Sequence, residues 1–269
     1  MLDRFESGSG PLVVLCHGAA SHSGQWRSLI ERLAPRYKVV AFDQYGYRES
    51  PKWHQDYPMT YSDQAEPILD YINHEQGSVQ DKIHLVGHSH GASIVTTIAL
   101  ALGRRVTSLS IYEPNSFGVL ADEIRLVRQY NEIVRLFGDL EDRLENVESQ
   151  EAFAKDLIHF WLGEGSWIRL PARQRAQLVE LMPQTVHEVH AALFCPFSIE
   201  PLKEIADRVM LMYDPSSPPH ARAVSEYYEK VLAHSRVERF QGCGHLAPIT
   251  HSDLVNAAIA DHIEQTNTH

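Results

Sequence analysis

The sequence predicts an α/β fold in which a mostly parallel β-sheet is flanked by helices. The alternation of two kinds of segment carries this prediction. Short, almost wholly apolar runs alternate along the chain with segments whose apolar residues recur at helical spacing. Strands covered on both faces give such apolar runs, and the covering helices give the periodic segments. With 269 residues, 43% of them hydrophobic, the chain can bury a large core, in one α/β domain with an insertion or in two small domains.

The predicted elements follow one another in the order of a doubly wound sheet. Strands are expected at 11–18, 37–43, 81–87 and 105–113, with helices at 24–35, 61–75 and 90–102 between them. Pro35 ends the first of these helices. Towards the end of the chain we expect strands at 207–214 and 235–241 and helices at 219–233 and 252–264. Crossovers between parallel strands are right-handed in nearly all proteins.

One block interrupts this alternation. Residues 116–200 show helical periodicity and little strand character, as in "LADEIRLVRQYNEIVRLFG" and "QEAFAKDLIHFWLG". We therefore expect three parts: a core segment at 1–115, a helical insertion at 116–200 and a second core segment at 201–269.

Charge and cysteine content restrict the partners and the compartment. The formal net charge is −11, and an acidic chain repels nucleic acid and anionic membranes, so we expect neither as a partner. The three cysteines, Cys16, Cys195 and Cys243, form no C-x-x-C pair. The start "MLDRFESGSG" lacks the regions of a signal peptide. We expect a soluble cytoplasmic protein, and a homodimer is left open.

The string Gly87-His88-Ser89-His90-Gly91 has the pattern of a nucleophile elbow. In this pattern a serine occupies a strained turn between a strand and a helix, and the turn lifts the hydroxyl clear of the sheet. The neighbouring backbone comes close, so glycine is needed on both sides. Because a predicted strand precedes this string and a predicted helix follows it, Ser89 is the candidate nucleophile.

A serine needs a base and a donor set for the oxyanion. Among 16 histidines, His245 is the candidate base, because it follows the last predicted strand in "GCGHLAP" and precedes the last helix. That position lies on the same edge of a doubly wound sheet as Ser89. The backbone N–H groups of Ala19, after "CHG", and of His90 are the candidate oxyanion donors.

At this point the chain resembles the α/β-hydrolase superfamily over nearly its whole length. The resemblance rests on "CHGAA", "FDQYGYRES", "GHSHGAS" and "GCGHLAP", in that order. It implies a Ser–acid–His order of triad residues and a helical cap, which residues 116–200 would form. The family usually has two antiparallel strands before the first oxyanion-loop strand. Here only about ten residues precede it, so we expect a shortened sheet edge with "LDRFE" as the one remaining strand.

The triad acid has two candidates. In the family it usually follows the strand that here reads "RVMLMY", but in "YDPSSPPHAR" the expected place falls near Ser216 or Ser217. Asp214 is the carboxylate nearby. Some cap-bearing relatives, such as haloalkane dehalogenases, take the acid from the preceding strand, where this chain has Glu113. We favour Glu113, at the carboxyl end of the strand that follows the elbow helix, and keep Asp214 as the alternative.

We expect no metal and no cofactor. His17, His22, His88 and His90 lack carboxylate partners at metal-ligand spacing. In the cap, the aromatic residues Tyr130, Phe153, Phe160, Trp161 and Trp167 are mostly expected in the core, with some facing the serine and favouring a partly apolar small-molecule substrate.

These features favour a serine hydrolase that cleaves a small to medium, partly apolar ester, thioester or lactone through an acyl-enzyme. Two alternatives keep the same triad: carbon–carbon bond hydrolysis of the meta-cleavage type and cofactor-free perhydrolysis. From another class, a ligand receptor on a hydrolase scaffold also keeps it. A serine at the elbow argues against dehalogenase and epoxide hydrolase chemistry, which use aspartate there.

Overall fold

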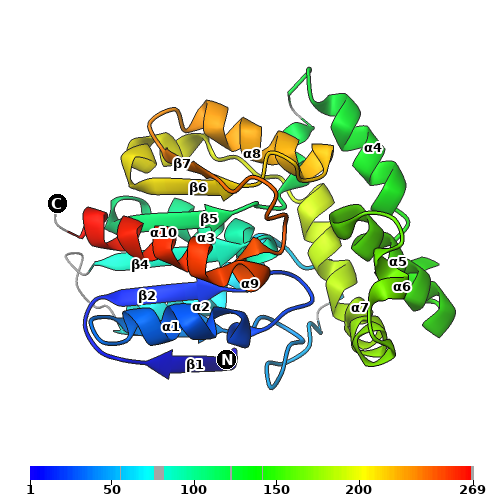
Figure 1. The fold of residues 1–269 in the computed structure, drawn as a ribbon, viewed down its shortest axis with the longest axis horizontal. Helices are drawn as coiled ribbons and strands as arrows, with labels where there is room; N and C mark the ends of the chain where they lie inside the picture. The colour runs from blue at the N-terminus through cyan, green and yellow to red at the C-terminus, as the bar shows by residue number, and fades with distance from the viewer. Residues whose placement is uncertain (55, 76–81, 122, 141, 268–269) are drawn as a thin grey trace.

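A computed structural model describes residues 1–54, 56–75, 82–121, 123–140 and 142–267, and these residues form a seven-stranded sheet in the order β1-β3-β2-β4-β5-β6-β7 (Figure 1). The strands are β1 (Arg4–Ser7), β2 (Leu12–Cys16), β3 (Lys38–Phe42), β4 (Ile83–His88), β5 (Val106–Tyr112), β6 (Val209–Tyr213) and β7 (Arg236–Arg239). β1 pairs antiparallel with β3, and every other neighbouring pair is parallel. The predicted fold class is confirmed.

The helices outside the stretch between β5 and β6 cover the sheet. They are α1 (Arg27–Leu33), α2 (Tyr61–Glu75), α3 (His90–Leu102), α8 (Pro219–Val231), α9 (Ala247–Thr250) and α10 (Ser252–Thr266), with 3₁₀ turns η1 (Ser23–Trp26) and η2 (Gly103–Arg105). α1 and α10 lie on the near side of the sheet in Figure 1, and α2 and α3 lie behind it.

Several predicted boundaries shift by a few residues. The helix expected at 24–35 is a 3₁₀ turn followed by α1, which already ends at Leu33. The strand expected at 235–241 covers only Arg236–Arg239, and α8 stops at Val231 while α10 continues to Thr266. The expected start of the third strand, residue 81, lies outside the described residues. The short helix α9 was not predicted, because four residues carry too little periodicity to be recognised.

The alternation of side chains along β2 divides the interior into two cores. Val13 and Leu15 pack with residues of α1 and α10 on one face. Leu12, Val14 and Cys16 pack with residues of α2, α3 and α8 on the other. All five side chains are fully buried. Burial on both faces explains why the strand is apolar at every position.

The amino-terminal edge of the sheet is short, as predicted. β1 begins two residues after the start of the expected strand "LDRFE" and pairs with β3 from Arg4 opposite Phe42 to Ser7 opposite Val39. Leu2, just before it, is buried in the larger core. One antiparallel strand therefore closes this edge.

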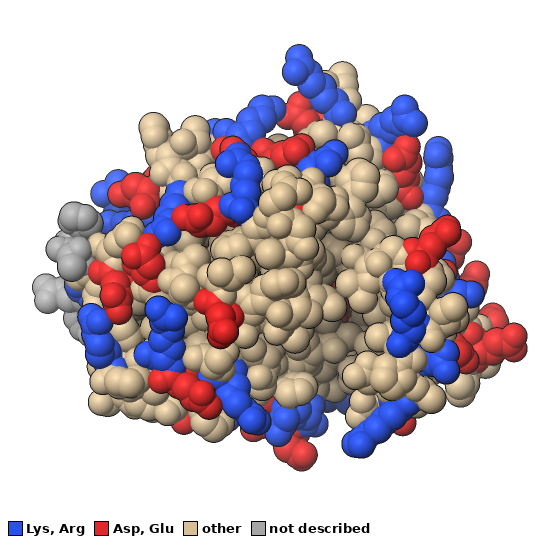
Figure 2. Space-filling model, in the orientation of Figure 1, with Lys and Arg blue, Asp and Glu red and all other residues tan. Residues whose placement is uncertain are grey.

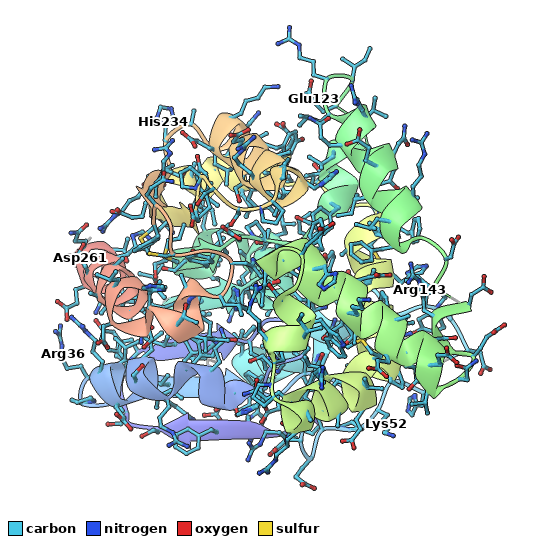
Figure 3. All side chains as sticks on the ribbon, turned by 45° about the vertical axis from the view of Figure 1, so that its right-hand side comes forward. Arg36, Lys52, Glu123, Arg143, His234 and Asp261 are labelled. Carbon is cyan, nitrogen blue, oxygen red and sulfur yellow. The ribbon has the colours of Figure 1, made fainter. Side chains whose placement is uncertain are left out.

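Between β5 and β6 the described residues contain helices and no strand, and this stretch is called the helical insertion below. It comprises η3 (Phe117–Leu120), α4 (Val127–Phe137), η4 (Asp142–Leu144), α5 (Val147–Leu162), α6 (Ser166–Arg169), α7 (Ala172–Phe194) and η5 (Glu200–Arg208). In Figure 1 its helices α4–α7 stand together at one end of the sheet. An ion pair of 2.6 Å between Arg143 and Asp156 joins η4 to α5. Lys230 of α8 donates a hydrogen bond to Glu123, which lies between η3 and α4. Arg143 and Glu123 are labelled in Figure 3.

The surface carries charges of both signs. On the face shown in Figure 2, Lys and Arg side chains mix with Asp and Glu around the edge, and neither sign forms a continuous area. In the part of the chain that the structure describes, no helix combines the length and the apolar character needed to cross a lipid bilayer.

Two glycines let the elbow between β4 and α3 form. A Cβ at Gly91 would lie 2.3 Å from the carbonyl oxygen of Cys16, and one at Gly87 would lie 2.4 Å from the carbonyl oxygen of Gly91. Both distances are much shorter than the closest contacts that a Cβ atom makes in proteins. Glycine at these positions is therefore a condition for α3 to pack beside β2.

We predict that Gly91→Ala destabilises the fold by about 3 kcal/mol or more, because the clashing atom belongs to the backbone of a central strand. Gly24→Ala is the matched control. Its Cβ would meet the His22 ring at 2.5 Å, but that side chain is exposed and can rotate away. Urea denaturation measures both. Equal losses in the two variants would show that backbone crowding at the elbow is not the cause.

Candidate active site

Ser89 occupies the turn between β4 and α3 with a left-handed backbone, φ +54° and ψ −117°. This conformation is costly for a residue with a side chain and persists only where surrounding structure holds it. Here the Ser89 N–H donates to the carbonyl oxygen of Tyr112 at 2.8 Å, which continues the pairing of β4 with β5 beyond the last strand residue. The sheet itself therefore holds the strained turn.

His245 joins Ser89 to Glu113. The His245 Nε2 lies 3.0 Å from the Ser89 Oγ, and its Nδ1 lies 2.7 Å from the Glu113 Oε2. All three residues are buried. A carboxylate can only accept at Nδ1, so the proton of the neutral ring is on Nδ1 and Nε2 is free to accept from the serine hydroxyl.

Glu113 is held in place by its other oxygen and by its backbone. Its Oε1 accepts from the Asp214 N–H at 2.8 Å and from the Ser217 hydroxyl at 2.6 Å. Its own N–H donates to the Met212 carbonyl oxygen at 3.0 Å, with φ at +42°. Glu113 thus follows β5 in the same manner as Ser89 follows β4.

Asp214, the alternative acid, forms no hydrogen bond or ion pair with His245. Its Oδ1 accepts from the N–H and hydroxyl of Ser216, at 2.7 and 2.6 Å, and its Oδ2 accepts from the Gly244 N–H at 2.6 Å. Burial raises the pKa of Asp214, but the hydrogen bonds from Ser216 and Gly244 outweigh it and keep the pKa below its usual value. Both carboxylate oxygens of Asp214 therefore accept hydrogen bonds, one from the turn at Ser216 and the other from the loop before His245.

Three contacts fix the loop that carries His245. Besides Asp214, the Tyr112 hydroxyl donates to the Gly244 carbonyl oxygen at 2.8 Å. His88 lies 2.9 Å from the His245 carbonyl oxygen through its Nε2. Since a carbonyl oxygen only accepts, His88 is protonated on Nε2. The histidine loop is therefore tied to the ends of β4, β5 and β6.

The histidines beside Ser89 are structural and uncharged. Burial holds the pKa of His88 well below its usual value and lowers that of His90 to about 3. The His90 ring contacts the Gln64 and Asn115 amides. His17, with its pKa lowered by burial to about 4, bonds the Gly18 carbonyl oxygen at 2.8 Å.

These histidines do not meet at one point that could bind a metal. Across the described ranges, no three side chains of His, Cys, Asp or Glu are grouped for a metal ion.

The loop after β2 runs close to the serine. A Cβ at Gly18 would lie 2.9 Å from the His88 Nδ1 and 3.3 Å from the Ser89 Cβ, so a side chain at residue 18 would crowd both of these residues. Among the described residues, the N–H groups of Ala19 and His90 have no hydrogen-bond partner. The next N–H, of Ala20, donates to the Tyr47 hydroxyl at 2.8 Å.

A cavity of about 280 Å³ lies between this loop, the serine and the helical insertion. Ser89 and His245 form part of its wall on the side of the sheet. The wall on the insertion side is mostly apolar and includes Phe137, Leu157, Ile158, Phe160, Trp161, Leu178, Met182, Val189 and Leu193. An apolar cavity with few polar groups at one end is typical of a small-molecule site.

Trp161 of α5 stacks on the His245 ring, with centroids 3.5 Å apart and planes 14° apart. Of the five aromatic residues singled out in the sequence, Phe160 and Trp161 line the cavity. Phe153 and Trp167 are buried, and Tyr130 donates to the Leu193 carbonyl oxygen. The helical insertion thus covers one face of the His245 ring.

Sequence reasoning missed Tyr47 and Glu188. The Tyr47 hydroxyl donates to the Glu188 Oε2 at 2.7 Å, and both residues are buried. One signal was available: Glu188 stands on the apolar stripe of its helix, between Thr185 and Ala192, which also line the cavity. A carboxylate on such a stripe is rare without a partner or a function.

The chain belongs to the alpha/beta hydrolase family, whose model matches residues 13–258. An uncharacterized protein of Mycobacterium tuberculosis is 28% identical over 122 residues, which make up 45% of this chain and 33% of that protein. The match therefore spans about a third of the length of that relative. A pimeloyl-(acyl-carrier protein) methyl ester esterase of Aeromonas hydrophila is 25% identical over 190 residues, 66% of this chain and 68% of the esterase.

A solved structure shows the same fold. A thermophilic esterase from Thermogutta terrifontis superposes with a TM-score of 0.71 at 18% identity, covering 98% of this chain and 93% of that one.

We predict that Trp161→Leu moves the His245 ring-proton resonances downfield, because the indole stacked on the ring shields them. Nuclear magnetic resonance of histidine-labelled protein measures this shift. Trp53→Leu is the control, since Trp53 contacts Tyr45, His54 and Tyr57 and does not line the cavity. His245 resonances that stay unchanged in Trp161→Leu would show that the two rings do not stack in solution.

Proposed function

We propose that this protein is a serine hydrolase that cleaves a small to medium, partly apolar ester, thioester or lactone through an acyl-enzyme. One observation carries the proposal: the unbroken chain of hydrogen bonds from Ser89 through His245 to Glu113. The cavity at Ser89 supports it, because a substrate placed there meets the serine hydroxyl.

In the first half-reaction, the Ser89 Oγ attacks the substrate carbonyl carbon while the His245 Nε2 takes the hydroxyl proton. The carbonyl π electrons move onto the oxygen. Glu113 stabilises the imidazolium through Nδ1–H and keeps the ring in the tautomer that leaves Nε2 free. The oxyanion accepts from the N–H groups of Ala19 and His90, which have no hydrogen-bond partner among the described residues.

When the tetrahedral intermediate collapses, the bond to the leaving group breaks and His245 Nε2–H gives the leaving oxygen or sulfur its proton. In the second half-reaction, water attacks the acyl-enzyme and gives its proton to Nε2. Collapse of the second intermediate returns that proton to the Ser89 Oγ and releases the acid. No cofactor enters these steps.

The cavity supports the partly apolar character of the substrate. A volume of about 280 Å³ suits a small to medium molecule, and the insertion side offers mainly aliphatic and aromatic groups. The Aeromonas relative acts, by its name, on a methyl ester, which favours an ester as the bond cleaved here.

We predict that a fluorophosphonate probe labels the protein and that Ser89→Ala abolishes the labelling while the circular dichroism spectrum stays the same. Ser93→Ala, on the same helix, is the control and keeps the label, since the Ser93 hydroxyl is bonded to Asn115. Labelling that survives in Ser89→Ala would overturn the assignment of the nucleophile. A panel of p-nitrophenyl esters of graded chain length then tests turnover.

We predict that Glu113→Gln lowers kcat by a factor on the order of 10⁴, because the amide favours the wrong tautomer of His245. Asp214→Asn should lower it by only about ten- to hundredfold, through displacement of the loop held at Gly244. Both are measured on one ester at saturating concentration. If Asp214→Asn is the more severely impaired variant, Glu113 is not the acid of the triad.

A further inference from the structure

A carboxyl group from the helical insertion lies in the wall of the cavity that holds Ser89. Glu188 of α7 lines this cavity, yet it is fully buried. It lies among apolar wall residues, with Val189 beside it and Met182 and Ala192 on neighbouring turns of α7. Because desolvation of a carboxyl group is costly, its position here requires an explanation.

Among the described residues, one of the two Glu188 carboxyl oxygens has a hydrogen-bond partner and the other has none. The Oε2 accepts from the Tyr47 hydroxyl at 2.7 Å, and that hydroxyl accepts from the Ala20 N–H at 2.8 Å. The Oε1 is buried and has no hydrogen-bond partner among the described residues. Within the same ranges, no Lys or Arg side chain lines the cavity or forms an ion pair with Glu188.

The surroundings favour the neutral acid. Burial raises the pKa of Glu188 to about 8, and the hydrogen bond from Tyr47 offsets only part of this rise. Because Oε2 already accepts from Tyr47, the acid proton resides on Oε1. An O–H donor without an acceptor among the described residues then lies in the wall of the cavity, and leaving such a group unpaired after a substrate has entered costs binding energy.

We propose that Glu188 determines specificity by donating a hydrogen bond from its unpartnered carboxyl oxygen to a neutral oxygen, a ketone or hydroxyl, on the substrate chain in the cavity. The inference rests on the proposed function in one respect, that this cavity receives the substrate. It goes further by naming a second polar group on that substrate, apart from the bond that is cleaved.

The test measures binding without turnover, in protein carrying Ser89→Ala. Methyl hexanoate, methyl 4-oxohexanoate and methyl 5-oxohexanoate are titrated by calorimetry. We expect at least one oxo ester to bind about 5- to 100-fold more tightly than methyl hexanoate. Glu188→Gln should keep this preference, since its amide can donate, and Glu188→Leu should abolish it while binding methyl hexanoate at least as well.

Met182→Leu is the matched control. Met182 lines the same cavity from the same helix, and its side chain carries no hydrogen-bond donor. This variant should keep the preference for the oxo ester. Equal weakening of all three esters in Glu188→Leu would mean that Glu188 only supports the loop at Ala20 through Tyr47, and the proposal would be wrong.

The pH dependence distinguishes a donor from an acceptor. The protonated acid is present below its pKa, so affinity for the oxo ester should be high at pH 6–7 and fall as the pH rises past about 8. Glu188→Gln should show no such fall. Tyr47 and Tyr61 lie near Glu188, and His88 and His245 line its cavity; all four are kept in both proteins. The two histidines of α7, His187 and His190, are also kept.

Two results would overturn the inference. One is an absence of preference for either oxo ester. The other is that methyl 5-aminopentanoate binds more tightly than methyl hexanoate and that Glu188→Gln removes this difference. Glu188 would then be an ionised carboxylate that binds cations. A failure of the proposed function would be seen in a different measurement, as a lack of hydrolysis by the protein with Ser89 intact. The titrations do not require turnover, so the two failures can be distinguished.

Discussion

The site depends on two residues with side chains held at positive φ at the ends of adjacent strands. Ser89 follows β4 with φ +54°, and Glu113 follows β5 with φ +42°. Such conformations cost about 1–3 kcal/mol each. Each residue is held because its N–H bonds a carbonyl of the next strand, Tyr112 and Met212 respectively. The parallel sheet thus turns both side chains towards one point, where the His245 ring lies between them.

Much of this arrangement can be predicted from local sequence. The apolar runs specify the strands, since a strand buried on both faces is apolar at most positions. Gly87 and Gly91 identify the elbow because backbone contacts there exclude a Cβ. His245 is recognised by its place after the last strand. The choice between Glu113 and Asp214 depends on which way each carboxylate turns after its strand, and that is set by hydrogen bonds to Ser216, Ser217 and Gly244.

Contacts between the helical insertion and the rest of the protein were not predictable. Tyr47 and Glu188 are 141 positions apart, and each looks ordinary within its own segment. Helical periodicity shows that α5 buries one face, but not that Trp161 on that face meets His245. The insertion forms most of the cavity wall. The positions of its side chains relative to the core, such as those of Glu188 and Trp161, are what sequence patterns predict least well. A cytoplasmic location and a homodimer stay predictions.

The contact of His88 with the backbone of His245 has a consequence for altering this protein. In a Gly-x-Ser-x-Gly string the residue before the serine is a natural choice for randomisation, because its side chain has no part in the chemistry. Here that side chain bonds the carbonyl oxygen of His245, the proposed base for Ser89. A library at position 88 would therefore vary the placement of the base together with the elbow, and clones recovered from it would differ in rate for reasons unrelated to substrate fit.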